Sequence, residues 1–359
     1  MFTRSLSFLS QELVAKFSAQ AIMNSVKLNS GYELPLLGLG TWQTKPEQTK
    51  VAVKTALKIG YRHIDTAPNY NNEKEIGEAI NEWINDGGKR EELFVTTKLP
   101  TYGNRPDDVC KYVNKSLANL KLDYIDLYLM HMPFSLCPDE KEMNPALGGD
   151  GRVILDKTNH IDIWKQMEAQ VNRGVVKSLG VSNFNVIQLE KLFYGSVIHP
   201  SVIQVELHAY LQQPEMRYLA ETLNIKVVAY SPLGSPAAKK HFAEKYGLQA
   251  EVADLLNDPV VVEIAKCKNK TPAQILLMFL LQQCIAVIPK SANPERIKEN
   301  ADVFDCYLNE EDMKKLTFLN KGPKGRIINF LFWKGVEDHP EYPFRRELPL
   351  LLKAMKSIT

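Results

Sequence analysis

Short apolar runs alternate with amphipathic helical stretches along most of this chain, and this alternation restricts its fold more than any other feature. Eight runs of strand length lie between Leu36 and Lys290. Residues 47–59 and 73–83 are two of the helical stretches, the second opening after Asn72, a good N-cap residue. Such alternation predicts a parallel sheet covered by helices. The expected strands lie at Leu36–Leu39, Arg62–Asp65, Leu93–Lys98, Tyr124–His131, Val175–Val181, Val202–Leu207, Lys226–Tyr230 and Ile285–Ile288.

A helix-covered parallel sheet is either an open doubly wound sheet or a closed barrel. An open sheet that binds a dinucleotide normally carries Gly-x-Gly-x-x-Gly after its first strand. Here Gly38 and Gly40 are followed by Thr41, Trp42 and Gln43, so the third glycine is missing, and no Walker loop occurs in the sequence. A barrel takes about 250 residues plus insertions, which this chain of 359 residues accommodates. The sequence therefore predicts an α/β fold, a (β/α)8 TIM barrel.

Three long segments interrupt or follow the alternation. Pro133–Asn159 lies after the fourth run, Ser235–Asn257 lies after the seventh, and a tail rich in proline begins at Gly322. Loops that follow barrel strands commonly carry function, so we expect these long loops and the C-terminal tail to cover the active-site face. The expected organisation is an N-terminal extension at residues 1–25, one barrel domain at 26–345 and a tail at 346–359.

Charge and cysteine content restrict the partners. The net charge is +2, from 44 basic and 42 acidic residues interspersed along the chain, which gives no electrostatic reason to expect a nucleic acid or a membrane as partner. The five cysteines form no Cys-x-x-Cys pair and have no histidine at metal spacing, so we expect reduced thiols and no metal site. No apolar run approaches the roughly 20 residues that cross a bilayer. These features favour a cytoplasmic protein that acts on a small molecule.

The N-terminal segment leaves a second location open. Residues 1–22 contain Arg4 and Lys16, four serines and one acidic residue, Glu12, without a long apolar core. This composition excludes a good secretory signal but weakly resembles a mitochondrial presequence. A disordered extension or an upstream start codon is the alternative.

Four polar residues stand at or just beyond the ends of expected strands: Asp65, Tyr70, Lys98 and His131. Active sites of (β/α)8 barrels are built at the C-terminal ends of the strands. A tyrosine can donate a proton to a carbonyl oxygen if a nearby ammonium group lowers its pKa from about 10. Lys98 would supply that ammonium group, Asp65 would hold it, and His131 would orient the carbonyl. The four residues therefore predict proton delivery rather than covalent catalysis.

Three ordered segments resemble the signatures of the aldo-keto reductases. The first is Gly60–Tyr70, with Asn72 and Glu73 close behind it. The second is Gly174–Phe184, and the third runs from Ile288 to Asn300. The resemblance extends from about residue 26 to residue 345 and so covers almost the whole chain.

This resemblance implies a monomeric NADP-dependent oxidoreductase that converts aldehydes or ketones to alcohols. Tyr70 would be the general acid, assisted by Asp65, Lys98 and His131 as above. The implied cofactor, NADPH or NADP+, would lie extended across the barrel mouth. The cofactor residues implied are Thr41, Trp42, Asp65, Ser182, Asn183, Gln204, Tyr230, Ser231, Leu233, Ser235, Lys290, Ser291, Arg296, Glu299 and Asn300. The substrate residues implied are Trp42, Tyr70, His131 and Met132.

The preference for a phosphorylated cofactor has separate support in the sequence. Asn293 is a typical N-cap and Pro294 a typical first-turn residue, so a helix is expected to begin there. A helix start flanked by Lys290 and Arg296 forms a ready anion site. A 2′-phosphate suits such a site, which favours NADPH over NADH.

Two departures from the family pattern bear on the substrate. Many members have a tryptophan directly after the catalytic histidine, where this chain has Met132, and the segment from Leu99 to Tyr102 also lacks a familiar tryptophan. We therefore expect a roomier, more apolar pocket, suited to bulky aldehydes, prenyl-type carbonyls or steroid-like ketones rather than to sugars. Two other functions stay open: a non-catalytic cofactor-binding sensor or structural protein, and an enzyme acting mainly as an alcohol or steroid dehydrogenase.

Overall fold

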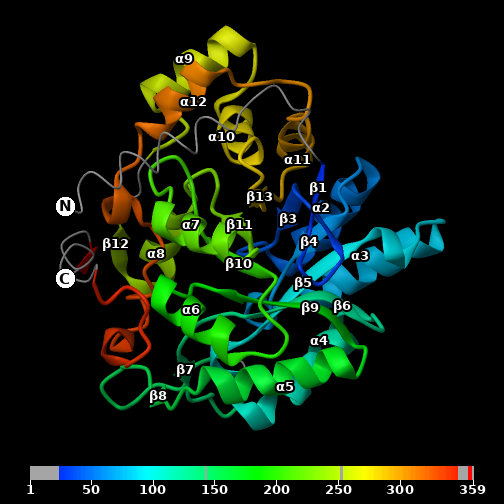
Figure 1. Ribbon diagram of the computed structural model, residues 1–359, viewed down its shortest axis with the longest axis vertical. Helices are drawn as coiled ribbons and strands as arrows, with labels where there is room; N and C mark the ends of the chain where they lie inside the picture. The colour runs from blue at the N-terminus through cyan, green and yellow to red at the C-terminus, as the bar shows by residue number, and fades with distance from the viewer. Residues whose placement is uncertain (1–23, 142–143, 251–253, 347–354, 358–359) are drawn as a thin grey trace.

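The structure is a computed structural model that describes residues 24–141, 144–250, 254–346 and 355–357. Eight parallel strands form its central sheet, and each pairs with its neighbour in chain order. Figure 1 shows them at the centre of the molecule, with helices around them. The strands are β3 (Gly38–Gly40), β4 (His63–Asp65), β5 (Phe94–Leu99), β6 (Ile125–Met130), β9 (Val176–Ser182), β10 (Val202–Glu206), β11 (Lys226–Tyr230) and β13 (Ala286–Val287).

A short seam between the first and last strands closes the sheet into a barrel. Leu37 bridges Val287 and Gly40 bridges Lys290, both in parallel orientation. Gly40 is required at this seam because a Cβ atom there would lie 2.6 Å from the backbone oxygen of Ile288. The expected (β/α)8 barrel is thus confirmed, and all eight strands lie within two residues of their expected bounds.

Helices on the outside bury the barrel. β5 and β6 are buried along their whole length, as parallel strands covered on both faces should be. Helix α10, the crossover before β13, is buried from Gln274 to Leu281 and begins with a capping box between Thr271 and Gln274. The helices that follow or precede the barrel strands are α2 (Pro46–Lys58), α3 (Glu73–Asn85), α4 (Val109–Leu120), α5 (His160–Asn172), α6 (Val186–Gly195), α7 (Pro214–Thr222), α10 (Pro272–Leu281) and α11 (Pro294–Ala301).

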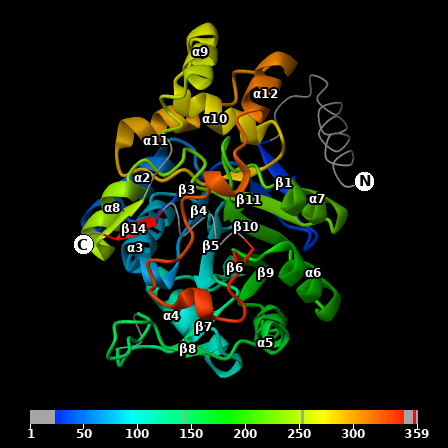
Figure 2. The ribbon, with the colours of Figure 1, turned by 90° about the vertical axis from the view of Figure 1, so that its left-hand side faces the viewer.

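Additional elements lie in the three long segments and at the N-terminal side. Figure 2 shows the C-terminal segment, orange to red, crossing the face of the barrel close to α8. These elements are the hairpin β1–β2 (Ser25–Lys27, Glu33–Pro35), the hairpin β7–β8 (Ser135–Leu136, Leu155–Asp156), helices α8 (Ala238–Tyr246), α9 (Pro259–Lys268) and α12 (Glu310–Thr317), and the antiparallel pair β12–β14 (Leu248–Ala250, Met355–Ser357).

Two kinds of feature are absent from the described residues. Within these ranges no helix has the length and apolar character needed to span a membrane. The same ranges contain no group of three or more histidine, cysteine or acidic side chains placed to hold a metal ion. Residues 1–23 of the extension expected at residues 1–25 lie outside the described residues, and the expected domain bounds stay a prediction.

Candidate active site

The four side chains expected to carry the chemistry meet at one end of the barrel. Asp65 ends β4, Lys98 lies near the end of β5, and His131 directly follows β6. Tyr70 ends a single 3-10 turn, Pro68–Tyr70, in the loop after β4. The Nζ atom of Lys98 lies 2.6 Å from Asp65 Oδ1 and 3.4 Å from the Tyr70 hydroxyl oxygen. The rings of Tyr70 and His131 meet edge to face, with centroids 5.8 Å apart.

The Lys98 ammonium group is completely buried and fully engaged. It donates to Asp65 and, at 2.8 Å, to the backbone oxygen of Thr66. The second oxygen of Asp65 accepts a hydrogen bond of 2.7 Å from Gln204 Nε2. Asp65 therefore links Lys98 on one side to β10 on the other, which fixes the lysine behind the tyrosine.

The protonation state of Tyr70 differs from the expectation. Burial, with Asp65 and Tyr230 as further causes, raises the pKa of Tyr70 well above its ordinary value. The expectation that Lys98 lowers the pKa of Tyr70 was thus wrong for this geometry, because burial of the hydroxyl is the largest cause and raises its pKa. Burial also lowers the pKa of His131 well below its usual range, with Lys98 as a second cause. At neutral pH Tyr70 therefore holds its proton and His131 is neutral.

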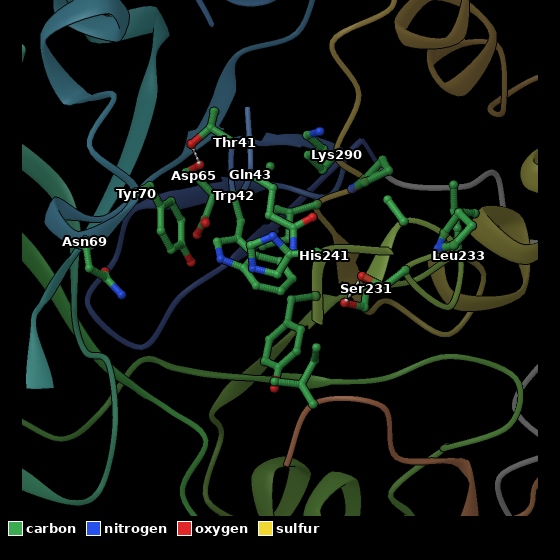
Figure 3. A pocket seen from close by; sticks show the side chains of 18 of the residues that line it. Thr41, Trp42, Gln43, Asp65, Asn69, Tyr70, Ser231, Leu233, His241 and Lys290 are labelled. Carbon is green, nitrogen blue, oxygen red and sulfur yellow. Dashed lines mark hydrogen bonds between the residues drawn. The ribbon is translucent and has the colours of Figure 1, made fainter. Parts of the chain in front are cut away.

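Asn72 has another role than the expected helix cap. Its side chain makes no capping hydrogen bond to α3. Instead Asn72 Oδ1 accepts from the Thr66 hydroxyl at 2.9 Å, and its Nδ2 donates to the backbone oxygen of Thr41 at 2.9 Å. Thr41 in turn donates its hydroxyl to the backbone oxygen of Asp65 at 2.8 Å (Figure 3). Asn72 thus ties together the loops after β3 and β4, which lie next to the predicted catalytic residues Asp65 and Tyr70.

One large cavity, of about 1300 Å³, opens above these side chains. It extends from Tyr70 and His131 to the start of α11, and all three long segments contribute to its wall. Lys98 is the one predicted site residue that does not line it, since it lies behind Tyr70. The other predicted residues all line it: Thr41, Trp42, Asp65, Tyr70, His131, Met132, Ser182, Asn183, Gln204, Tyr230, Ser231, Leu233, Ser235, Lys290, Ser291, Arg296, Glu299 and Asn300.

Polar side chains at the ends of β9, β10 and β11 form one hydrogen-bond network along the cavity floor. The Tyr230 hydroxyl donates to Asn183 Oδ1 at 2.7 Å, and Asn183 Nδ2 donates to the backbone oxygen of His131 at 3.0 Å. The Ser182 hydroxyl donates to the backbone oxygen of Gln204 at 2.9 Å. These contacts hold the amide of Asn183 and the ring of Tyr230 in fixed positions at the cavity floor.

The far end of the cavity has the properties of an anion site. Asn293 caps α11 as expected, and its Oδ1 accepts from the backbone nitrogens of Glu295 at 2.9 Å and Arg296 at 3.2 Å. Lys290 and Arg296 flank this helix start. Partial desolvation lowers the pKa of Lys290, although the residue remains exposed to solvent, so an anion beside it would favour its charged form. Figure 3 shows Lys290 on the side of the cavity away from Tyr70.

Comparison with known proteins agrees with this geometry. The family model described as "Aldo/keto reductase family" matches residues 36–321. The chain belongs to the aldo/keto reductase family. It is 42% identical to aldo-keto reductase family 1 member A1 of Rattus norvegicus over 329 residues, 89% of this chain and 98% of that protein. The Homo sapiens protein of the same name is 42% identical over 327 residues, 89% of this chain and 97% of that protein.

A solved structure confirms the architecture of this aldo/keto reductase. The aldose reductase of Schistosoma japonicum superimposes with a TM-score of 0.81 at 40% sequence identity. The match covers 90% of this chain and 100% of that one. Membership of the family makes the protein an oxidoreductase related to carbonyl reductases.

Sequence reasoning missed an aromatic wall in this aldo/keto reductase. The His241 ring on α8 meets Trp42 edge to face at 5.5 Å, and Figure 3 shows the two rings together in the cavity. Phe332 stacks on Phe242 at 5.5 Å and on Tyr246 at 4.7 Å. The run Phe330-Leu331-Phe332-Trp333 was the signal that could have identified this wall, because four large apolar residues in a tail rich in proline need a partner.

Two further residues that line the cavity each carry a polar atom without a hydrogen-bond partner among the described residues. Gln43 Nε2 and Asn69 Oδ1 are buried and have no hydrogen-bond partner among the described residues. Both side chains line the cavity (Figure 3). Buried polar atoms are rarely left unpaired in a folded protein, so their presence here is typical of a binding site. No sequence pattern indicated either residue.

Proposed function

We propose that this protein reduces aldehydes or ketones to alcohols with NADPH. The observation that carries the proposal is the position of the Tyr70 hydroxyl, which lies in contact with buried Lys98 and beside His131 at the bottom of the large cavity. A tyrosine that keeps its proton, a neutral histidine and a buried cation suit proton donation to a carbonyl oxygen. They do not form a nucleophile with an adjacent base.

The cavity suits an extended nicotinamide dinucleotide. Asn183, Gln204 and Tyr230 offer amide and ring partners near Tyr70, and the cationic side chains of Lys290 and Arg296 offer a phosphate site at the other end. The unpaired amide of Gln43 lies between these ends and supplies a donor for a phosphate oxygen. A bound NADPH would supply a hydride to the carbonyl carbon. A 2′-phosphate beside Lys290 and Arg296 favours NADPH over NADH.

In this proposal the protein supplies the proton from Tyr70. It also stabilises the negative charge of the tyrosinate that remains. Tyr70 passes its hydroxyl proton to the carbonyl oxygen, so the substrate gains one hydride and one proton and becomes an alcohol. The tyrosinate that remains lies 3.4 Å from the Lys98 ammonium group, which stabilises it. His131 orients the carbonyl oxygen toward Tyr70. In the reverse direction the tyrosinate accepts the proton of the alcohol.

The substrate class follows from the wall of the cavity. Trp42, Phe330, Phe332 and Trp333 line it together with Met132. Such a wall favours bulky apolar carbonyl compounds, such as aromatic or prenyl aldehydes and steroid-like ketones, over the sugars that the name of the aldose reductase of S. japonicum indicates for that relative. A panel in which glucose or xylose is preferred over every apolar carbonyl would refute this part of the proposal.

The decisive experiment compares wild type with Tyr70→Phe by following NADPH absorbance, and measures cofactor binding separately by fluorescence. We expect wild type to turn over, and the variant to bind NADPH normally with kcat reduced by about 10² to 10⁴. Cofactor binding without turnover of any carbonyl by wild type would instead favour a sensor or structural protein. A cytoplasmic location and a monomeric state stay predictions.

A further inference from the structure

A buried carboxylate holds the base of the C-terminal segment that forms part of the cavity wall. Glu206 is the last residue of β10, and its side chain has no exposed surface. Its Oε1 atom accepts the backbone N–H of Ile327 and its Oε2 atom accepts that of Ile328, both at 2.8 Å. His208 Nε2 lies 3.0 Å from Oε1 and is the third group in contact with this carboxylate. Two consecutive amides of a distant segment are thus fixed to one side chain.

The residues that follow this anchor line the cavity. We call residues 327–334 the wall loop. Ile328, Phe330, Phe332, Trp333 and Lys334 of the wall loop all contribute to the cavity surface. Beyond the anchor, the Tyr342 hydroxyl donates to the backbone oxygen of Asn329 at 2.7 Å. Glu206 and Tyr342 thus hold three consecutive residues, Ile327 to Asn329, directly before the aromatic side chains that enter the cavity.

The same strand also positions the catalytic residues. Side chains two residues apart along a strand point to the same face, so Gln204 and Glu206 share one face of β10. Gln204 contacts Asp65 at 2.7 Å, whereas Glu206, one step nearer the strand end, contacts the wall loop. One strand thus sets the distance between the proton-donating group and the opposite wall.

We propose that Glu206 is a positioning residue for substrate selection: it fixes the wall loop at the width that bulky carbonyl substrates require. The part of this inference that concerns substrates rests on the proposed function. Removing one acceptor oxygen leaves a buried amide unpaired, which is more costly than the hydrogen bond itself. The loop should then move, and wide substrates should be affected while small ones are not.

The chain contains a matched control for this carboxylate. Glu168 on α5 is also buried, and its Oε1 atom accepts the backbone N–H groups of Val197 and Ile198, both at 2.8 Å. Neither Glu168 nor these two residues lines the cavity. Glu168→Gln therefore removes the same buried negative charge outside the cavity lining, while its amide oxygen can still accept both N–H groups.

The test combines hydrogen exchange with kinetics for Glu206→Gln and Glu168→Gln. In Glu206→Gln we expect amide exchange in residues 326–334 to accelerate on the order of tenfold. We expect kcat/KM to fall by about tenfold for a bulky aromatic ketone, mainly through KM, and by less than about twofold for a small aldehyde. Glu168→Gln should leave exchange in residues 326–334 and both KM values unchanged.

Several outcomes would overturn the inference. Unchanged exchange at residues 326–334 in Glu206→Gln would show that the carboxylate does not hold the wall loop. An equal loss for small and bulky substrates would reject a role in selection. If wild type reduced no carbonyl, the proposed function and the substrate half of this inference would both fail, while the exchange data would still decide whether Glu206 is the anchor. Should Glu206→Gln fail to fold, Glu206→Asp keeps the charge but draws the loop toward β10, and KM should again rise for wide substrates only.

Discussion

Lys98 lies closer to Asp65 than to Tyr70, with its Nζ atom 2.6 Å from the carboxylate and 3.4 Å from the hydroxyl oxygen. Both members of the ion pair are buried, with side-chain exposures of 0% and 3%. Because the distance to the carboxylate is the shorter one, Asp65 is the main partner of Lys98 before the reaction. In the proposed reaction the tyrosine becomes a second partner only after it has lost its proton.

Removal of Lys98 should therefore harm stability as well as catalysis. Lys98→Met leaves Asp65 buried without its cation, and we expect a loss of about 3 to 5 kcal/mol in the free energy of unfolding. Adding Asp65→Asn should recover part of this loss, because the stranded charge is then removed. Urea denaturation of the single and double variants measures the difference. Strictly additive losses would show that the two side chains are not coupled.

Buried histidine should make the protein sensitive to mild acid. Burial lowers the pKa of His63 to about 4, whereas an unfolded histidine titrates near 6.5. Its contribution to stability is thus fully present above about pH 6.5 and is lost as the pH falls toward 4, because only the unfolded chain takes up the proton. The loss from this residue is up to about 3 kcal/mol. Denaturation midpoints across this range should fall less steeply for His63→Gln; equal slopes would contradict the prediction.

The start of α11 should determine cofactor choice. Arg296 lines the cavity beside the capped helix start. We expect Arg296→Met to weaken NADPH binding by about 10- to 100-fold and to leave NADH binding unchanged, because only NADPH carries the 2′-phosphate. Lys298→Met is the control, since Lys298 lies on the same helix but does not line the cavity. Equal weakening of both cofactors would place the phosphate elsewhere.

The stacked rings should couple α8 to the wall loop. Phe332→Ala removes the contacts to Phe242 and Tyr246, each aromatic pair being worth about 0.5 to 1.5 kcal/mol. We expect kcat/KM for bulky apolar carbonyls to fall by about tenfold, and cofactor release, followed by stopped-flow fluorescence, to accelerate. Phe318→Ala, at a ring that is 87% exposed, should change neither quantity. An unchanged rate of cofactor release in Phe332→Ala would show that α8 and the wall loop are not coupled.

The sequence was informative where one physical requirement dominates. Buried strands such as β6 need mostly apolar runs, so their positions could be predicted within two residues. The cap of α11 was also predictable, because Asn293 followed by Pro294 satisfies the free amides of a helix start locally.

Prediction failed where distant segments decide the outcome. Asparagine is a common helix cap, but the side chain of Asn72 forms hydrogen bonds with Thr41 and Thr66 instead. The pKa of Tyr70 was expected to fall, but burial depends on the packing of the whole barrel and raises it. Likewise, nothing local to Glu206 indicates that its acceptors would serve Ile327 and Ile328, more than 100 residues later.

Because β13 closes the barrel against β3, the ribosome makes the two ends of the cavity at different times. The four proposed catalytic residues all occur by residue 131, whereas the strand that closes the barrel and the anion site beside Lys290 come about 160 residues later. At about 5 to 20 residues per second, a ribosome needs roughly 10 to 30 s to cover that stretch. During this interval the nascent chain carries its proton donor without a complete groove. The groove can form only once the last barrel strand has been made, so ligand binding should report that the ribosome has passed β13.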